Sequence, residues 1–261
     1  MALLAGKTVV VSGVGAGLGH QVAAAVVRDG GNAVLGARTE ANLAKSAAEI
    51  DPDGAHTAYR TADITDEAQC ESLAELARER FGGIDAVVHV AAWDGYFGGV
   101  EDADFTTWQS VIDVNLLGSL RMTRACLPAL KERGGSVVFI GTQSAVAAPS
   151  QVRQAAYAAS KGALTSAMYS LARELGPARI RVNTVLPGWM WGPPVQAYVQ
   201  FAAHTEKVPE ADVLQRLTDR MALPELATDG DVADAAVFLA SDRARAITGQ
   251  SLLVNAGELM R

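Results

Sequence analysis

The hydrophobic residues of this chain fall into short continuous runs that alternate with longer stretches of helical periodicity. The runs are rich in β-branched residues, which is typical of buried strands. Seven strands are predicted, over Thr8–Ser12, Asn32–Gly36, His56–Thr61, Ala86–Val90, Ser136–Ile140, Arg181–Leu186 and Ser251–Val254. Because these strands read as apolar on both faces, we expect helices to cover both sides of the sheet.

The stretches between the strands are rich in alanine and repeat their apolar residues at helical spacing. Helices are predicted over Gly17–Asp29, Thr39–Ile50, Asp66–Phe81, Asp104–Glu132, Tyr157–Leu175 and Asp231–Ala240. Strands that alternate with helices form mostly parallel sheets through right-handed crossovers. The pattern therefore predicts an α/β chain with a doubly wound Rossmann-type fold, a seven-stranded, mostly parallel sheet with helices on both faces.

No linker, low-complexity stretch or fixed-period repeat divides the sequence, so residues 1–261 are predicted to form a single domain. One segment breaks the alternation, because Pro187 to Pro224 holds several prolines and two short helical patterns. Long insertions after the carboxyl end of a strand are usually functional loops. Residues 189–224 are therefore interpreted as a substrate lid, and the alternative is a surface excursion without a role.

The composition narrows the class of protein. Hydrophobic residues make up 49% and aromatic residues only 6%, so a core of Ala, Val and Leu is expected. The net charge of -7 argues against nucleic-acid and membrane partners and favours a small-molecule substrate. The sequence has neither a signal peptide nor an apolar stretch of the ~20 residues that a membrane span needs, so a cytoplasmic protein is expected. Cys70 and Cys126 lack metal-ligand spacing and are interpreted as reduced packing residues, and no metal site is predicted.

A glycine-rich turn joins the first predicted strand to the first predicted helix. It contains Gly13, Gly15, Ala16, Gly17, Leu18 and Gly19. Glycine permits positive φ and a close approach to the main chain, and a helix N-terminus favours a phosphate. Such a turn can be merely a tight turn, but after the first strand of an α/β chain it predicts the pyrophosphate site of a dinucleotide.

The end of the second strand bears on which dinucleotide binds. The acidic residue that would hold the adenosine 2′-hydroxyl of NAD is missing, and Arg38 follows the strand instead. A guanidinium suits a 2′-phosphate, so NADP(H) is predicted in preference to NAD(H). The alternative is an exposed arginine at a helix start, and the glycine turn supplies no second basic residue.

Tyr157 and Lys161 lie four residues apart in a predicted helix, so both side chains point along one face. A neighbouring positive charge lowers the pKa of a phenol from about 10 toward the range useful for acid/base catalysis. Ser144, just beyond the fifth strand, could hydrogen-bond a substrate oxygen or be an ordinary loop serine. Asn115 interrupts an apolar helical run and could serve either structure or a proton relay. Each residue is weak evidence alone.

Together these motifs give the whole chain a resemblance to the short-chain dehydrogenases/reductases. Ser12, Gly13, Gly17 and Gly19 resemble the family's glycine motif, with serine in the place of threonine. The catalytic tetrad of the family is matched in order and spacing by Asn115, Ser144, Tyr157 and Lys161. The resemblance extends to Asp63 and Ile64, at the adenine ring, and to the segment bordering the nicotinamide, which includes Pro187, Gly188 and Trp189.

Three positions depart from the family's pattern. The turn after the fourth strand, normally N-N-A-G, is His89, Val90, Ala91 and Ala92, so His89 is interpreted as a core residue or one that supports the site from behind. Gly192 replaces a threonine that contacts the carboxamide or pyrophosphate, which leaves more of this contact to the backbone near Trp189. Ala37 stands where NAD-preferring members often carry aspartate, which is consistent with NADP.

The resemblance implies an NAD(P)-dependent oxidoreductase that transfers hydride between a nicotinamide cofactor and an alcohol or ketone. Tyr157 would be the acid/base, Ser144 would orient the substrate oxygen, Lys161 would bond the nicotinamide ribose, and Asn115 would hold a water linking Lys161 to solvent. The alternatives are a dinucleotide-binding regulator without turnover and an enoyl reductase or isomerase on the same scaffold.

Aromatic residues gather near the predicted site in a chain otherwise poor in rings. They predict an apolar substrate, cyclic compounds included, although they could instead anchor loops or an oligomer contact. The expected walls are Trp93, Tyr96, Phe97, Trp189, Met190, Trp191, Tyr198 and Phe201. The helix Tyr157–Leu175 has a face of small residues that another helix could approach. With the resemblance, this implies a homotetramer in which that helix and Asp104–Glu132 pack against symmetry mates.

Overall fold

The computed structural model describes residues 2–95, 98–149 and 152–260. Its main sheet has seven strands: β1 (Thr8–Ser12), β2 (Asn32–Ala37), β3 (Thr57–Thr61), β4 (Ala86–His89), β5 (Gly135–Ile140), β6 (Ile180–Pro187) and β9 (Ser251–Val254). The strand order is β3-β2-β1-β4-β5-β6-β9, and every neighbouring pair is parallel. The predicted fold is therefore confirmed. The order reverses between β1 and β4, and open α/β sheets bind ligands where such a reversal opens a crevice at the strands' carboxyl ends.

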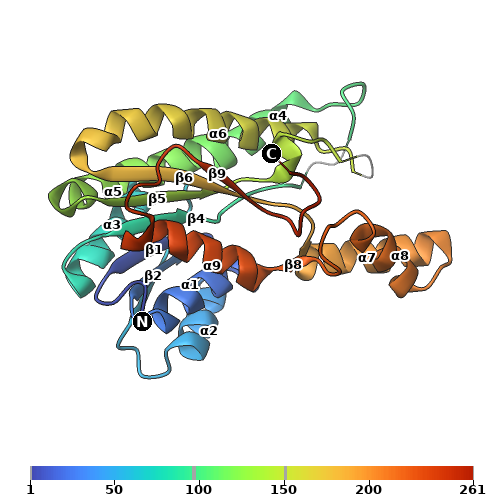
Figure 1. The fold of residues 1–261 in the computed structure, drawn as a ribbon. Helices are drawn as coiled ribbons and strands as arrows, with labels where there is room; N and C mark the ends of the chain where they lie inside the picture. Colours follow the sequence, from blue (N-terminus) through green and yellow to red (C-terminus); the bar gives the residue numbers. More distant parts are fainter. Residues whose placement is uncertain (1, 96–97, 150–151, 261) are drawn as a thin grey trace.

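Helices cover both faces of this sheet (Figure 1). One face carries α1 (Leu18–Arg28), α2 (Glu40–Ile50) and α9 (Asp229–Ala240), and the other carries α3 (Glu67–Phe81), α5 (Ser119–Arg133) and α6 (Ala155–Leu175). Short 3-10 helices span Gln143–Ala145, Gly176–Ala178 and Asp242–Ala244.

Strand β1 shows why a continuous apolar run is needed. Successive side chains of a strand point to opposite faces, so Val9 and Val11 join the core beneath α1 and α9, while Val10 joins the core beneath α3, α5 and α6. All three are 0% exposed. Full burial of a valine side chain contributes about 1.5–3 kcal/mol, so a polar residue at any of these positions would be costly.

The helix predicted over Asp104–Glu132 contains a turn that periodicity did not reveal. It consists of α4 (Phe105–Ile112), a π-helical turn (Asp113–Gly118) and α5. The wider turn brings Asn115 into the interior, where it is 0% exposed. Single π turns inside α-helices are often found at functional sites.

The segment between β6 and α9 carries the two short helices that the sequence suggested. After the short strand β7 (Met190–Trp191), which pairs with β8 (Ala227–Thr228), come α7 (Pro193–Glu206) and α8 (Glu210–Thr218). These two helices enclose a small core of their own, made by Val199, Ala202, Ala203, Val213, Leu217 and Leu226. Figure 1 shows them projecting beyond the end of the sheet.

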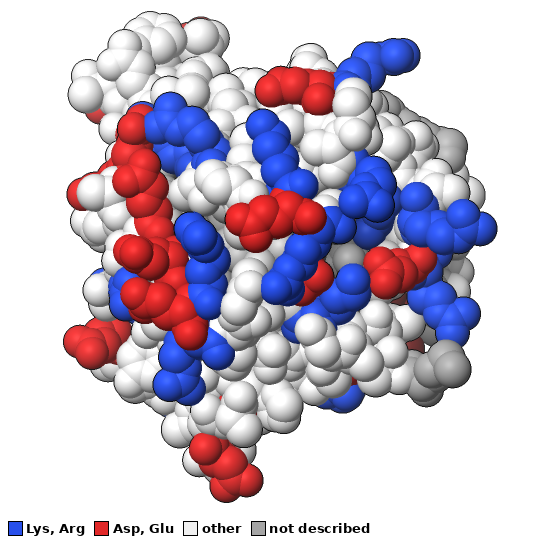
Figure 2. Space-filling view, turned by 90° about the vertical axis from the view of Figure 1, so that its left-hand side faces the viewer, with Lys and Arg blue, Asp and Glu red and all other residues white. Residues whose placement is uncertain are grey.

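The surface at the opposite end of the molecule carries charges of both signs. Figure 2 shows acidic and basic side chains standing beside one another on that face. Among the residues described, no helix combines the length and apolarity that crossing a membrane requires. Cys70 and Cys126 are buried and unbridged, as predicted.

Candidate active site

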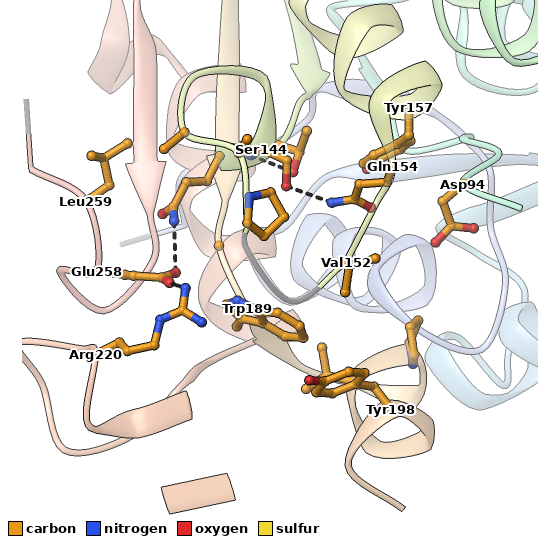
Figure 3. A pocket seen from close by; sticks show the side chains of 18 of the residues that line it. Asp94, Ser144, Val152, Gln154, Tyr157, Trp189, Tyr198, Arg220, Glu258 and Leu259 are labelled. Atoms are coloured by element: carbon orange, nitrogen blue, oxygen red, sulfur yellow. Dashed lines mark hydrogen bonds and ion pairs between the residues drawn. The ribbon is translucent and has the colours of Figure 1, made fainter. Parts of the chain in front are cut away.

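A cavity of about 1010 Å³ opens at the carboxyl ends of β5 and β6. The residues after β5, the start of α6 and helix α7 form its walls, and the loop after β9 closes one end (Figure 3). Of the predicted catalytic residues, Ser144 and Tyr157 both line it. Gly188 and Trp189, predicted to border the cofactor, line it as well.

Tyr157 lies in the first turn of α6 and is half-buried. Burial raises the pKa of its phenol, the negative charge of Asp94 raises it further, and a hydrogen bond with the Thr142 side chain acts in the opposite direction. The expectation that a neighbouring positive charge lowers this pKa is wrong for this structure, because burial and the charge of Asp94 raise it. Tyr157 is therefore protonated at neutral pH and can donate a proton.

Lys161 lies one turn further along α6 and is 1% exposed. Its Nζ donates to the carbonyl oxygen of Ile140 at 2.7 Å and stands 5.9 Å from the centre of the Tyr157 ring. Burial lowers the pKa of Lys161 to about 8, and Asp94 opposes this shift. Below that pH the side chain keeps a positive charge behind the phenol.

Ser144 is held in the 3-10 helix Gln143–Ala145 at the end of β5. Its backbone N–H donates to Thr142 Oγ1 at 3.2 Å, and Thr142 caps the short helix. Its hydroxyl oxygen accepts a hydrogen bond from Gln154 Nε2 at 2.9 Å. Figure 3 shows this bond between Gln154 and Ser144 across the wall of the cavity.

Asn115 lies outside the cavity wall and braces it from behind. Its Oδ1 accepts from the N–H of Trp93 at 2.7 Å, and its Nδ2 donates to the Trp93 carbonyl at 3.0 Å and to Ser160 Oγ at 2.9 Å. The π turn thus ties the loop after β4 to helix α6. The role of Asn115 in holding a water remains a prediction.

A second hollow, a groove of about 590 Å³, follows the carboxyl ends of β1, β2 and β4. The predicted cofactor residues that line it are Gly13, Gly15, Arg38, Asp63, Ile64, Ala91 and Ala92. Gly13 has a φ of +94°, and a Cβ at this position would lie 2.2 Å from the backbone nitrogen of Ala91. No larger residue fits there, so the two strand ends approach closely because position 13 is glycine.

The groove fits the adenosine half of a dinucleotide. Arg38 is exposed at its edge and makes no ion pair within the part of the chain that the structure describes. Asp63 accepts hydrogen bonds from the N–H and hydroxyl of Thr65, which fix its carboxylate beside the groove. A free guanidinium and an oriented carboxylate match the phosphate and amino groups of such a ligand.

Other predicted cofactor residues line neither hollow. Gly19 is buried against the glycine turn, where a Cβ would meet the Gly13 carbonyl oxygen at 2.2 Å, so its role is close packing. Leu18 packs on the hydrophobic core. The remaining residues that line neither hollow are Ala16 and Gly17 at the start of α1, Lys161 behind Tyr157, and Pro187 at the end of β6.

The side chain of Asp229 fills the space beside Gly192, and the sequence did not indicate this contact. A Cβ at position 192 would lie 2.8 Å from Asp229 Oδ1, and one at Gly17 would lie 3.3 Å from Asp229 Oδ2. The carboxylate of Asp229 thus lies between Gly192 and Gly17, and burial raises its pKa. The threonine expected at position 192 would require the carboxylate of Asp229 to shift.

The aromatic walls were predicted only in part. Trp189, Tyr198 and Phe201 line the cavity, and the rings of Trp189 and Tyr198 lie 5.0 Å apart. The prediction was wrong for Trp93, which lines the groove, and for Met190, which packs on the core. It was also wrong for Trp191, which is 37% exposed on β7. Met190 and Trp191 are neighbours on β7, so their side chains point to opposite sides of the strand. Their closeness in the sequence does not reveal this difference. Tyr96 and Phe97 lie outside the described residues.

One end of the cavity is polar, which the sequence did not indicate. Glu258 is buried, pairs with Arg220, and accepts from Gln143 Nε2 at 2.8 Å. Gln143 Oε1 in turn accepts from Asn255 Nδ2 at 2.5 Å. Figure 3 places Arg220 and Glu258 at the opposite end of the cavity from Tyr157 and Asp94. The cavity is therefore apolar in its middle and polar at both ends.

His89 belongs to the core, as predicted. It is 1% exposed, its ring stacks on Phe139, and its Nε2 lies 2.9 Å from Thr123 Oγ1. Burial lowers its pKa to about 3, so it stays neutral at physiological pH. Within the described residues, no group of three or more His, Cys, Asp or Glu could hold a metal ion.

Comparison with known proteins identifies similar chains of nearly full length. A family model described as "Enoyl-(Acyl carrier protein) reductase" matches residues 13–258. The L-fucose dehydrogenase of Bos taurus is 33% identical, covering 97% of this chain and 89% of its own length. The D-beta-hydroxybutyrate dehydrogenase of Cupriavidus necator is 28% identical, covering 95% of each chain.

Solved structures agree with this similarity. A short-chain type dehydrogenase/reductase from Mycobacterium ulcerans superposes with a TM-score of 0.86 at 28% identity, covering 98% of this chain and 90% of that one. A structure of actinorhodin polyketide ketoreductase with NADPH superposes with a TM-score of 0.88 at 27% identity, covering 97% of both chains.

Proposed function

The chain belongs to the short-chain dehydrogenase/reductase family, and from this premise we propose that it interconverts a ketone and an alcohol with NADP(H) at the cavity containing Ser144 and Tyr157. The family's members are NAD(P)-dependent oxidoreductases that act on alcohols and ketones. The observation that carries the proposal is the convergence of two hydroxyl groups on one cavity, with a buried lysine behind one of them.

In the direction of reduction, Tyr157 donates its proton to the carbonyl oxygen of the substrate. Ser144 donates a hydrogen bond to the same oxygen and stabilises the charge that develops there. Lys161 lowers the cost of the phenolate that remains, because its ammonium lies behind the ring. The nicotinamide cofactor, when bound, supplies the hydride, and the protein supplies orientation and electrostatics. Oxidation follows the same path in reverse.

The walls of the cavity favour a neutral substrate with an apolar middle. Trp189, Tyr198 and Phe201 offer ring faces to such a group. The charge of Arg220 is offset by Glu258, and Asp94 adds a negative charge near Tyr157, so a carboxylate or phosphate gains little from the cavity.

We further propose that residues 1–261 act as one dinucleotide-binding domain, with residues 189–224 as a lid over the substrate.

A screen of the purified protein against ketones and alcohols tests this function. We expect NADPH absorbance at 340 nm to fall with neutral cyclic and aryl ketones and to change little with their carboxylated analogues. The same screen includes enoyl thioesters, because the matching family model is described as an enoyl reductase. Turnover of enoyl thioesters without any ketone reduction would contradict the proposed activity. It would show that the protein reduces a carbon–carbon double bond. Cofactor binding without any turnover would indicate a regulator.

The proposed preference for NADP(H) rests on Arg38. Arg38→Ala should weaken NADPH binding by about ten-fold or more and leave NADH binding almost unchanged, because a charge-assisted bond to the 2′-phosphate is lost. Titration of cofactor fluorescence measures both affinities, with the exposed Arg245, which lies outside the groove, replaced as the control. Equal losses for both cofactors, or a wild type that prefers NADH, would contradict the assignment.

We also propose that the protein is a homotetramer. Phe105, Leu117 and Tyr169, on α4, the π turn and α6, are 61%, 42% and 52% exposed, and symmetric packing of these helices would cover them. Light scattering coupled to size exclusion at micromolar concentration should give about four times the chain mass of 27.2 kDa. A fully active particle of a single chain mass would refute both the assembly and its support of the site.

A further inference from the structure

Among the residues that the structure describes, the Ser144 hydroxyl has one hydrogen-bond partner, and that partner is a donor. Gln154 Nε2 donates to Ser144 Oγ at 2.9 Å. A serine hydroxyl has one proton and two lone pairs. Because Gln154 occupies a lone pair with an N–H group, the Ser144 proton cannot be directed at Gln154 and is left for another acceptor.

From this geometry we propose that Gln154 is a positioning residue that keeps the Ser144 hydroxyl oriented as a hydrogen-bond donor toward the substrate oxygen. This inference rests on the proposed ketone reduction. A donated hydrogen bond also polarises the hydroxyl that accepts it, so the bond from Ser144 to the substrate becomes stronger. Gln154 acts through Ser144 and therefore needs no contact with the reacting atoms.

Backbone contacts on two sides fix the position of Gln154. Gln154 is the N-cap residue of α6, three residues before Tyr157, so the same helix start carries the acid and this positioning amide. Its backbone carbonyl accepts from Ala158 N at 2.9 Å, and its backbone forms a β-bridge with Gly98. The side chain is half-buried in the cavity wall. Alignment of Ser144 is thereby coupled to alignment of Tyr157.

Two substitutions separate this role from simple packing. Gln154→Leu removes the donor at similar volume and should lower kcat about ten-fold with little change in KM for the ketone. Gln154→Glu reverses the direction of the hydrogen bond to Ser144. An ionised carboxylate accepts a hydrogen bond from the Ser144 hydroxyl, which then no longer donates to the substrate. Loss of an oxyanion donor costs about 10²-fold in kcat, and this loss is expected at neutral pH.

The pH profile of Gln154→Glu provides the decisive readout. As the pH falls through the pKa of the new carboxyl, the protonated acid donates again and kcat should recover relative to the wild type. The titratable groups around the site are Asp94, Tyr157, Lys161 and the Arg220–Glu258 pair, and all are common to every variant. Gln154→Leu should therefore show no such acidic recovery.

Controls keep folding and function apart. Gln200→Glu adds the same charge on an exposed position of α7 outside the cavity lining and should behave as wild type. NADPH affinity should stay unchanged in both Gln154 variants, because Gln154 does not line the cofactor groove. In a Ser144→Ala background, Gln154→Glu should have no further effect.

Two kinds of failure can be told apart. Wild-type turnover of a ketone tests the proposed function, and the ratio of variant to wild type tests this inference. If Gln154→Leu matches the wild type, or if Gln154→Glu follows the wild-type pH profile while binding NADPH normally, Gln154 does not orient Ser144. The inference likewise fails if the effect of Gln154→Glu persists without the Ser144 hydroxyl.

Discussion

Tyr157→Phe is expected to lower kcat by about 10²-fold or more while NADPH affinity stays nearly unchanged. The substitution removes the transferable proton and keeps the ring that fills the cavity wall, and positioned proton transfer is usually worth at least this factor. Initial rates with the best ketone from the screen, together with a fluorescence titration of NADPH, measure the two quantities independently.

A matched control lies on the same helix. Tyr169 lies on α6 outside both hollows, so Tyr169→Phe removes a phenol of the same type and keeps the ring that the proposed helix packing would cover. It should keep wild-type activity. If Tyr157→Phe retained more than about a tenth of the wild-type rate, Tyr157 would not be the acid/base.

Lys161→Met should also lower kcat by about 10²-fold or more, because it removes the positive charge behind the phenol. In contrast to most buried substitutions, it should not destabilise the protein at pH 7. Burial holds the pKa of Lys161 near 8 instead of 10.5, which corresponds to a desolvation cost on the order of 3 kcal/mol. The unpaired Ile140 carbonyl that methionine leaves behind costs about 1–3 kcal/mol, so the two effects nearly cancel.

The stability difference between Lys161→Met and the wild type should depend on pH in a defined direction. The folded pKa is lowered, so between pH 8 and 10.5 the unfolded wild type binds more protons than the folded form, and its stability rises with pH there. The penalty for lysine is thus largest below pH 8 and disappears toward pH 10.5. Denaturant unfolding across this range measures it, with the exposed Lys131→Met as the control. A variant that is several kcal/mol less stable than the wild type at pH 7 would show that Lys161 stabilises the fold.

The sequence alone determined the features that depend on local periodicity. The valine run of β1 predicts a strand buried on both faces, and β1 lies inside the sheet between β2 and β4. The spacing of Tyr157 and Lys161 places both on one face of α6, because a helix repeats about every 3.6 residues. Ser144 was predicted at the carboxyl edge of the same sheet, since it lies just beyond the strand that ends at Ile140, and it lines the same cavity as Tyr157.

Only the tertiary structure decided which side chains meet across elements that are distant in the chain. The π-helical turn directs Asn115 inward, where it hydrogen-bonds Trp93 and Ser160. The helical spacing of apolar residues predicts a regular α-helix there. The pair of Arg220 and Glu258 joins the segment after α8 to the loop after β9, and no pattern within either segment signals that contact.

The same limit explains why the environment of each catalytic group escaped prediction. The pKa of Tyr157 reflects burial together with Asp94 and Thr142, which lie on different loops, so the spacing of Tyr157 and Lys161 did not predict the direction of its shift. Gln154 has no recognisable motif, and its bond to Ser144 exists because α6 begins at the edge of the sheet where β5 ends. Sequence spacing fixes what lies on one element, and packing between elements fixes the solvation and the hydrogen-bond direction on which the chemistry depends.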